Sequence, residues 1–72
     1  MEHKPFILLL GKQIKKLRKE KSLTQQELAY KCDMEKSNLI RIESGRTNPT
    51  TKTLKTIADA LDLKVKDFFD FE

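Results

Sequence analysis

The sequence predicts a small all-α protein with one domain. Apolar residues recur at intervals of three and four along most of the chain, a spacing typical of amphipathic helices rather than of strands. Glycine and proline occur only twice each among 72 residues, so few residues interrupt this pattern. A chain of this length has room for a single small hydrophobic core. We therefore treat residues 1–72 as one helical domain.

The first two helices are predicted from apolar stripes and from the residues at their N-termini. The first begins near Pro5, whose fixed φ suits the start of a helix, and it carries four lysines on its outer face. The second runs from Gln25 to Cys32, and Thr24 followed three residues later by Glu27 is typical of a capping box. The residues expected to face the core are Leu10, Ile14 and Leu17 on the first helix and Leu28, Ala29 and Cys32 on the second.

Three further segments complete the predicted fold. A third helix runs from about Lys36 to Ser44 and is followed by Gly45, the residue type best suited to the left-handed conformation after a helix. A fourth helix is capped by Thr50 or Thr51, and a short fifth spans Val65–Phe69. The residues expected to face inward are Leu39 and Ile42 on the third helix and Leu54, Ile57, Ala58 and Leu61, its last residue, on the fourth.

The connection between the second and third helices is the most informative feature. Only Asp33, Met34 and Glu35 separate them, and a turn this short makes the two helices cross steeply. This spacing, at about residues 24–44, is typical of a helix-turn-helix, in which one helix braces against the DNA backbone and the next enters the major groove. Any small helical bundle also has short turns, so the spacing alone does not specify DNA binding.

Charge is distributed unevenly along the chain. Residues 1–31 contain eight lysines and arginines against three acidic residues, residues 32–49 contain three of each, and residues 50–72 contain four against five. The net charge is +4, and a basic N-terminal half suits a polyanion such as DNA, since phosphate neutralisation releases counterions. A solvated lysine face would produce the same pattern, so charge alone leaves both interpretations open.

Two longer runs of the chain are distinctive: LTQQELA at residues 23–29 and IESGRTNP at residues 42–49, followed by Leu54, Ile57–Ala58 and Ala60–Leu61. Together they resemble the phage-repressor and Cro-type helix-turn-helix family, also called the xenobiotic-response-element family. The resemblance covers residues 10–69. It implies a five-helix, lambda-repressor-like DNA-binding domain.

The resemblance also implies roles at matching positions. Gln25 corresponds to a residue whose amide binds a DNA phosphate together with the positive end of the second helix. Arg18 and Glu43 correspond to a buried ion pair with a structural role. In the loop after the third helix, three residues correspond to contacts with the phosphate backbone: Arg46, Thr47 and Asn48.

The outer face of the third helix follows from the helical repeat of about 100° per residue. With Leu39, Ile42 and Glu43 turned inward, four residues are expected to face DNA bases: Lys36, Ser37, Ile40 and Arg41. Arg41 is the strongest candidate because its guanidinium can pair with O6 and N7 of guanine, and a phosphate contact is the alternative. Ile40 can contact a thymine methyl group or be an ordinary surface residue.

Three residues depart from the family pattern. Asp33 and Asp62 stand where the family has glycine in its turns, and aspartate tolerates the left-handed region better than most residues. Glu35 replaces the usual serine or threonine cap of the third helix, so a carboxylate lies at the positive helix end without a good cap. The base preference of the relatives therefore does not transfer directly to this chain.

These features predict a sequence-specific regulator of transcription that binds double-stranded DNA, expected to act as a homodimeric repressor on a palindromic operator. Two apolar groups exceed the needs of the core, the run at residues 6–9 and the set Phe68, Phe69 and Phe71. Either group could form the dimer surface, or both ends could pack together over the core. An antitoxin or a restriction-modification controller would bind DNA in the same way. A protein-interaction module that kept the fold without DNA binding is the alternative from a different class.

The sequence argues against other classes of protein. No paired carboxylates, nucleophile with a base, or phosphate-binding glycine loop indicates an enzyme, and the single histidine, His3, is expected to be inert. The single cysteine, Cys32, excludes an intrachain disulfide and favours a reducing cytoplasm. The apolar run at residues 6–10 is too short to span a bilayer. We expect no cofactor, no metal and no small-molecule effector.

Overall fold

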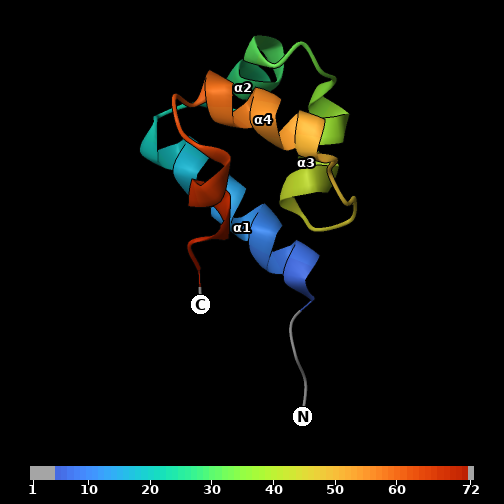
Figure 1. The fold of residues 1–72 in the computed structure, drawn as a ribbon. Coiled ribbons are helices and arrows are strands. Elements are labelled where there is room, and N and C mark those ends of the chain that lie inside the picture. The colour runs from blue at the N-terminus through green and yellow to red at the C-terminus, as the bar shows by residue number, and fades with distance from the viewer. Residues whose placement is uncertain (1–4, 72) are drawn as a thin grey trace.

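The computed structural model describes residues 5–71, which form four α-helices and one 3-10 helix (Figure 1). In chain order these elements are α1 (Phe6–Glu20), α2 (Gln25–Lys31), α3 (Lys36–Glu43), α4 (Thr51–Ala60) and η1 (Val65–Phe69). The predicted all-α class is confirmed, and each helix lies within a residue or two of its expected range. His3, which was expected to be inert, lies outside the described residues.

The fifth element differs from the prediction because it is a 3-10 helix rather than an α-helix. It has five residues, and the N–H of Asp67 donates to the Lys64 carbonyl oxygen at 2.9 Å, an i to i+3 hydrogen bond. The Asp67 carboxylate in turn accepts a hydrogen bond from the Lys64 N–H at 3.0 Å. A segment this short forms few α-helical hydrogen bonds, so the tighter 3-10 geometry is a common outcome.

Side-chain caps determine where two of the helices begin. Thr24 Oγ1 accepts a hydrogen bond from the Glu27 N–H at 3.0 Å, and Glu27 Oε1 accepts one from the Thr24 N–H at 2.8 Å, which completes the predicted capping box. At α4, the cap is Thr50 rather than Thr51, because Thr50 Oγ1 accepts a hydrogen bond from the Thr53 N–H. Both starts were therefore predictable from local sequence.

The hydrophobic core lies between α1 on one side and the group formed by α2, α3 and α4 on the other, with η1 packed against α1 (Figure 1). Phe68 belongs to this core and is completely buried, so its assignment to the surplus apolar groups was wrong. The reason is that η1 packs against both α1 and α4. The buried apolar residues are Leu10, Ile14, Leu28, Ala29, Cys32, Leu39, Ile42, Leu54, Ile57, Ala58, Leu61 and Phe68.

Several turns require a residue in the left-handed region. Asp33 and Asp62 have φ of 55° and 59°, as expected for positions where the family has glycine, and Gly45 has φ of 77°. Ser22, with φ of 59°, was not expected there. A left-handed residue reverses the chain directly after a helix, so these positions set the angles between consecutive helices.

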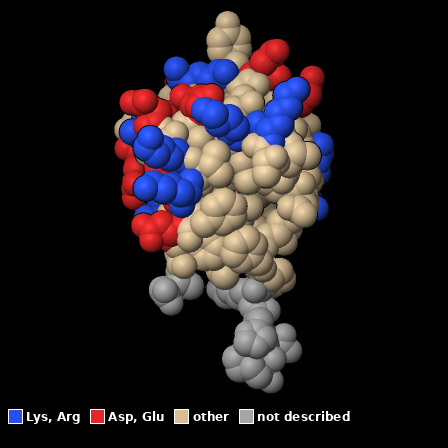
Figure 2. All heavy atoms as spheres, viewed as in Figure 1, with Lys and Arg blue, Asp and Glu red and all other residues tan. Residues whose placement is uncertain are grey.

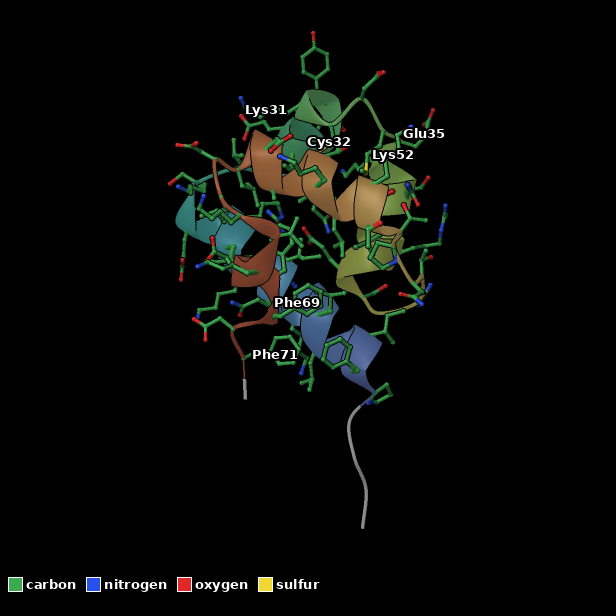
Figure 3. The ribbon with its side chains drawn as sticks, in the orientation of Figure 1. Lys31, Cys32, Glu35, Lys52, Phe69 and Phe71 are labelled. Atoms are coloured by element: carbon green, nitrogen blue, oxygen red, sulfur yellow. The ribbon has the colours of Figure 1, made fainter. Side chains whose placement is uncertain are left out.

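The two ends of the described chain meet on one side of the molecule. The ring of Phe6 stacks on that of Phe69, with centroids 5.8 Å apart and planes inclined by 11°, and it contacts Phe71 at 5.4 Å. Figure 3 places Phe69 and Phe71 at the end of the molecule opposite Lys31 and Glu35. We call Phe6, Phe69 and Phe71 the aromatic cluster. Both ends thus pack together, yet Phe6 remains 61% exposed and Phe69 40% exposed.

Within residues 5–71, no helix has the length and apolar character that crossing a bilayer requires. Over the same residues, histidine, cysteine, aspartate and glutamate side chains form no group of three that could hold a metal ion.

Candidate nucleic-acid interface

The turn between α2 and α3 is held by backbone hydrogen bonds and by one half-buried side chain. The N–H of Met34 donates to the Ala29 carbonyl oxygen at 3.0 Å, which closes the chain over the end of α2. Met34 packs against the hydrophobic core, and Asp33 beside it is exposed. Glu35 makes no side-chain hydrogen bond to the start of α3, as its replacement of a serine or threonine cap implies. The turn therefore sets the crossing of the two helices through the backbone and Met34.

α3 has one buried face and one exposed face. Leu39 is completely buried, whereas the adjacent Ile40 is 40% exposed. Asn38 is half-buried, in agreement with its place near the core side of the helix. The exposed residues include all four that the helical repeat turned outward: Lys36, Ser37, Ile40 and Arg41. Their contact with DNA bases remains a prediction.

An open hollow of about 890 Å³ lies along the outer side of the turn. It joins the end of α2 to the first part of α3, and its walls combine charged, amide and hydroxyl groups with one aromatic ring. Tyr30, which supplies that ring, is 85% exposed. The lining residues are Tyr30, Lys31, Asp33, Met34, Glu35, Ser37, Asn38 and Arg41.

Arg18 of α1 and Glu43 of α3 form a buried ion pair behind the exposed face. Arg18 Nε donates to Glu43 Oε2 at 2.7 Å and Arg18 Nη2 donates to Glu43 Oε1 at 3.0 Å. The two side chains are 6% and 2% exposed. Arg18 Nη1 also donates to the Leu23 carbonyl oxygen at 2.7 Å, just before α2. The pair thus ties α1 to α3 and to the chain entering α2.

Gln25, the expected phosphate contact, is joined to this ion pair. Its Nε2 donates to Glu43 Oε1 at 3.0 Å, and the residue is half-buried at the start of α2. Sequence reasoning placed Gln25 at the DNA surface and Glu43 in the core without connecting them. Only the fold brings these residues, 18 positions apart, into contact.

The loop after α3 lies on the surface. Arg46 and Asn48 are exposed, and Thr47 is half-buried. The N–H of Arg46 donates to the Arg41 carbonyl oxygen at 2.9 Å, so the start of the loop is held against the last turn of α3. The start of the loop is therefore fixed relative to α3, and its contact with phosphates stays a prediction.

The net charge at the surface of the helix-turn-helix motif differs from the sum of its charged residues. Residues 32–49 contain three basic and three acidic residues, but Glu43 is buried and already paired with Arg18. The other charged residues of this segment are all exposed: the basic Lys36, Arg41 and Arg46 and the acidic Asp33 and Glu35. Figure 2 shows lysine and arginine side chains interleaved with acidic ones over the face of the whole molecule that is in view. The motif presents a slight excess of positive charge to a polyanion.

Two residues that hold other elements against α1 were missed by sequence reasoning. Gln13 is buried, and its Nε2 donates to the Asp67 carbonyl oxygen at 3.0 Å and to that of Asp70 at 3.3 Å, which ties the C-terminal segment to α1. Gly11 lies where α1 approaches the backbone of α3. A polar residue within an apolar stripe and a glycine inside a helix were the available signals.

Comparisons with known proteins agree with this geometry. A helix-turn-helix family model matches residues 14–68. The chain is 43% identical over 58 residues to the immunity repressor protein of Bacillus phage phi105, a match that covers 81% of this chain and 40% of the repressor. The chain thus spans less than half the length of that relative.

Two crystal structures are similar in fold. The restriction-modification controller protein C.AhdI from Aeromonas hydrophila has a TM-score of 0.85 and 27% identity, with 88% of this chain and 96% of that chain covered. The regulator of biofilm formation SinR, crystallised in complex with DNA, has a TM-score of 0.78 and 39% identity, with 85% and 98% covered. These likenesses confirm the lambda-repressor-like fold.

Proposed function

The chain belongs to the Cro and C1-type helix-turn-helix family of DNA-binding transcriptional regulators, and we propose that it represses transcription as a homodimer on a palindromic operator. Members of this family are not enzymes. The similarity to a phage immunity repressor supports repression in particular. A cytoplasmic location belongs to the same proposal, because a regulator acts where the DNA is.

The exposed face of α3 carries this proposal. Arg41 supplies a guanidinium that can pair with O6 and N7 of guanine, and Ile40 supplies an apolar contact for a thymine methyl group. Lys36 and Ser37 lie in the first turn, where they can bind bases or adjacent phosphates. A helix with a guanidinium, an aliphatic side chain and a hydroxyl on one face carries the groups that bind base edges and thymine methyl groups in the major groove.

Phosphate contacts on both sides of α3 would hold it in register. Gln25 precedes the recognition helix and the loop of Arg46, Thr47 and Asn48 follows it. Phosphate contacts orient a protein on the duplex without selecting a sequence. In this proposal, therefore, the four residues on α3 select the operator and the flanking residues add affinity.

The homodimer is supported by the aromatic cluster and by the geometry of DNA. One recognition helix contacts few base pairs, whereas a two-fold dimer binds two half-sites about 34 Å apart. Aromatic rings exposed to this degree at a surface suit an interface, and Phe69 and Phe71 lie at the end of the molecule opposite the turn between α2 and α3 (Figure 3). A second copy is its proposed occupant because a closed two-fold pair is the commonest assembly and uses the same patch on both chains.

The DNA-binding part of the proposal is tested by selection from a random duplex library, followed by fluorescence anisotropy on the enriched site. We expect palindromic sites, and we expect Arg41→Ala to abolish specific binding. Lys55→Ala removes one positive charge from an exposed surface pair on α4 and should stay within about twofold of wild type. Failure to enrich any sequence would contradict a specific regulator. DNA binding by the wild type is measured first, because Arg41→Ala distinguishes a DNA-binding regulator from a protein-interaction module only if the wild type binds DNA. A regulator should then lose DNA binding in Arg41→Ala, whereas a protein-interaction module should keep its protein partner.

The dimer is tested by sedimentation with Phe6→Ser/Phe69→Ser. We expect this variant to be monomeric and to bind a full palindrome no better than a single half-site. Tyr30→Ser, which removes an even more exposed ring at the other end of the molecule, should sediment as the wild type does. A cluster variant that still sediments as a dimer would place the interface elsewhere.

A restriction-modification controller is the second candidate, favoured by the likeness to C.AhdI. A controller would use the same face of α3, so binding measurements alone do not separate the two. The position of the selected site in the genome does, because a controller site would lie beside restriction-modification genes.

A further inference from the structure

The Glu43 carboxylate accepts hydrogen bonds from two different parts of the protein. Arg18 approaches it from α1 with two nitrogens, at 2.7 and 3.0 Å. The amide nitrogen of Gln25 approaches from the start of α2, at 3.0 Å from Oε1. One buried carboxylate therefore joins the ion pair to a residue on the proposed phosphate-binding surface.

We propose that Glu43 is a positioning residue for DNA binding, because it orients the Gln25 amide so that the second N–H of Nε2 can donate to a phosphate. The chemistry of the amide leads to this conclusion. A carboxylate only accepts hydrogen bonds, so it binds the NH₂ end of the amide and repels the carbonyl end. With one hydrogen of Nε2 directed at Glu43, the other hydrogen is left for an acceptor outside.

Without Glu43, both ends of the amide would be free to turn toward DNA. A Gln25 whose oxygen faced a phosphate would place two acceptors against each other and weaken binding. Arg18 contributes indirectly, since its bidentate bond holds the Glu43 carboxylate and its third nitrogen holds the Leu23 carbonyl oxygen next to α2. The buried pair thus pre-organises one hydrogen bond to DNA as well as joining α1 and α3.

This inference rests on the phosphate contact of Gln25 in the proposed function. The neighbouring Gln26 provides a matched control for its test. Gln26 is exposed on the same helix. An exposed amide turns freely and exchanges its hydrogens rapidly, whereas an amide held by a carboxylate does neither.

The test compares four variants by fluorescence anisotropy on the selected operator. Gln25→Ala removes the contact. Arg18→Met/Glu43→Leu removes the acceptor without leaving a buried charge, which preserves the fold. We expect each to weaken binding about fivefold, the value of one hydrogen bond of about 1 kcal/mol. The triple variant should bind no more weakly than either, and Gln26→Ala should bind within about twofold of wild type.

The outcomes distinguish the two proposals. The positioning role of Glu43 would be overturned if the triple variant lost affinity for the operator by the product of the two separate losses. It would also be overturned if Gln25→Ala bound weakly while Arg18→Met/Glu43→Leu bound as tightly as wild type. If Gln25→Ala bound the operator as tightly as wild type, the proposed phosphate contact of Gln25 would be wrong as well. The proposal that Arg41 binds specific bases would not be affected.

A measurement on the unaltered protein does not depend on how the variants fold. In side-chain amide spectra recorded without DNA, the two NH₂ hydrogens of Gln25 give separate signals, and we expect the one directed at Glu43 to exchange at least tenfold more slowly than the NH₂ hydrogens of Gln26. Equal exchange rates would show that Glu43 does not hold the amide and would overturn the proposal.

Discussion

Gly11 of α1 and Ile42 of α3 meet backbone to backbone. A Cβ on Gly11 would lie 2.5 Å from the Ile42 carbonyl oxygen and 2.7 Å from that of Glu43, closer than any side chain can approach. The absence of a side chain at Gly11 therefore lets α1 lie directly against the last turn of α3. The same approach brings Arg18, two turns further along α1, within reach of Glu43.

Gly11→Ala should destabilise the protein even though alanine favours helices more than glycine does. The new methyl group has to displace backbone atoms of α3, so we expect a loss of about 2 kcal/mol despite a gain in helix propensity of about 1 kcal/mol. The thermal midpoint should fall by roughly 10 °C. Lys15→Ala, at an exposed position on the same helix, is the control and should move the midpoint little. An unchanged midpoint for Gly11→Ala would mean that α1 and α3 do not approach this closely.

Arg18→Met should cost about 3 to 5 kcal/mol, because it leaves the Glu43 carboxylate buried without its charge partner. Urea unfolding of the single and double variants measures this. Arg18→Met/Glu43→Leu should recover most of the loss, since it buries two apolar side chains in place of the pair. A double variant as unstable as the single one would show that packing around Arg18, rather than the unpaired charge, accounts for the loss.

Asp62→Gly should stabilise the protein by about 0.5 kcal/mol, since φ at this position is 59° and glycine adopts that conformation without strain. Asp59→Gly, three residues earlier and inside α4, should instead destabilise it by about 0.5 kcal/mol, because glycine is the poorer helix former and the exposed ion pair with Lys55 is lost. Thermal unfolding followed by circular dichroism resolves the two signs. A shift in the same direction for both variants would contradict the role assigned to the left-handed turn.

Cys32 should make stability depend on pH under alkaline conditions. Burial raises the pKa of its thiol above the ordinary value, because the thiolate is poorly solvated there. The unfolded chain then loses its thiol proton at lower pH than the folded one, so the stabilising contribution is complete below about pH 8.5 and declines as pH rises through the folded pKa. Urea unfolding between pH 7 and 10 should show a steeper decline for wild type than for Cys32→Ala. Parallel declines would rule out this linkage.

The helix starts, the turns and most of the core were accessible from sequence because local rules govern them. Thr24 and Glu27 lie three residues apart in the chain and cap α2 as the pattern predicts. Phe68 illustrates where such rules fail, since its neighbours resemble an exposed apolar tail and only the packing of η1 on α1 and α4 buries it. Local patterns describe which face of an element is apolar, but not which other element covers that face.

The sequence by itself determined the all-α class, the helix-turn-helix and the outward residues of α3, because helical periodicity, caps and a three-residue turn are local properties. The tertiary structure decided that Gln25 and Glu43 share a hydrogen bond, that Gln13 holds the C-terminal segment, and that Phe6 meets Phe69. Each of these contacts joins residues far apart in the chain. Which residues meet depends on the distances and crossing angles between helices. These are set by burial of the whole core, and no single segment of the sequence encodes them.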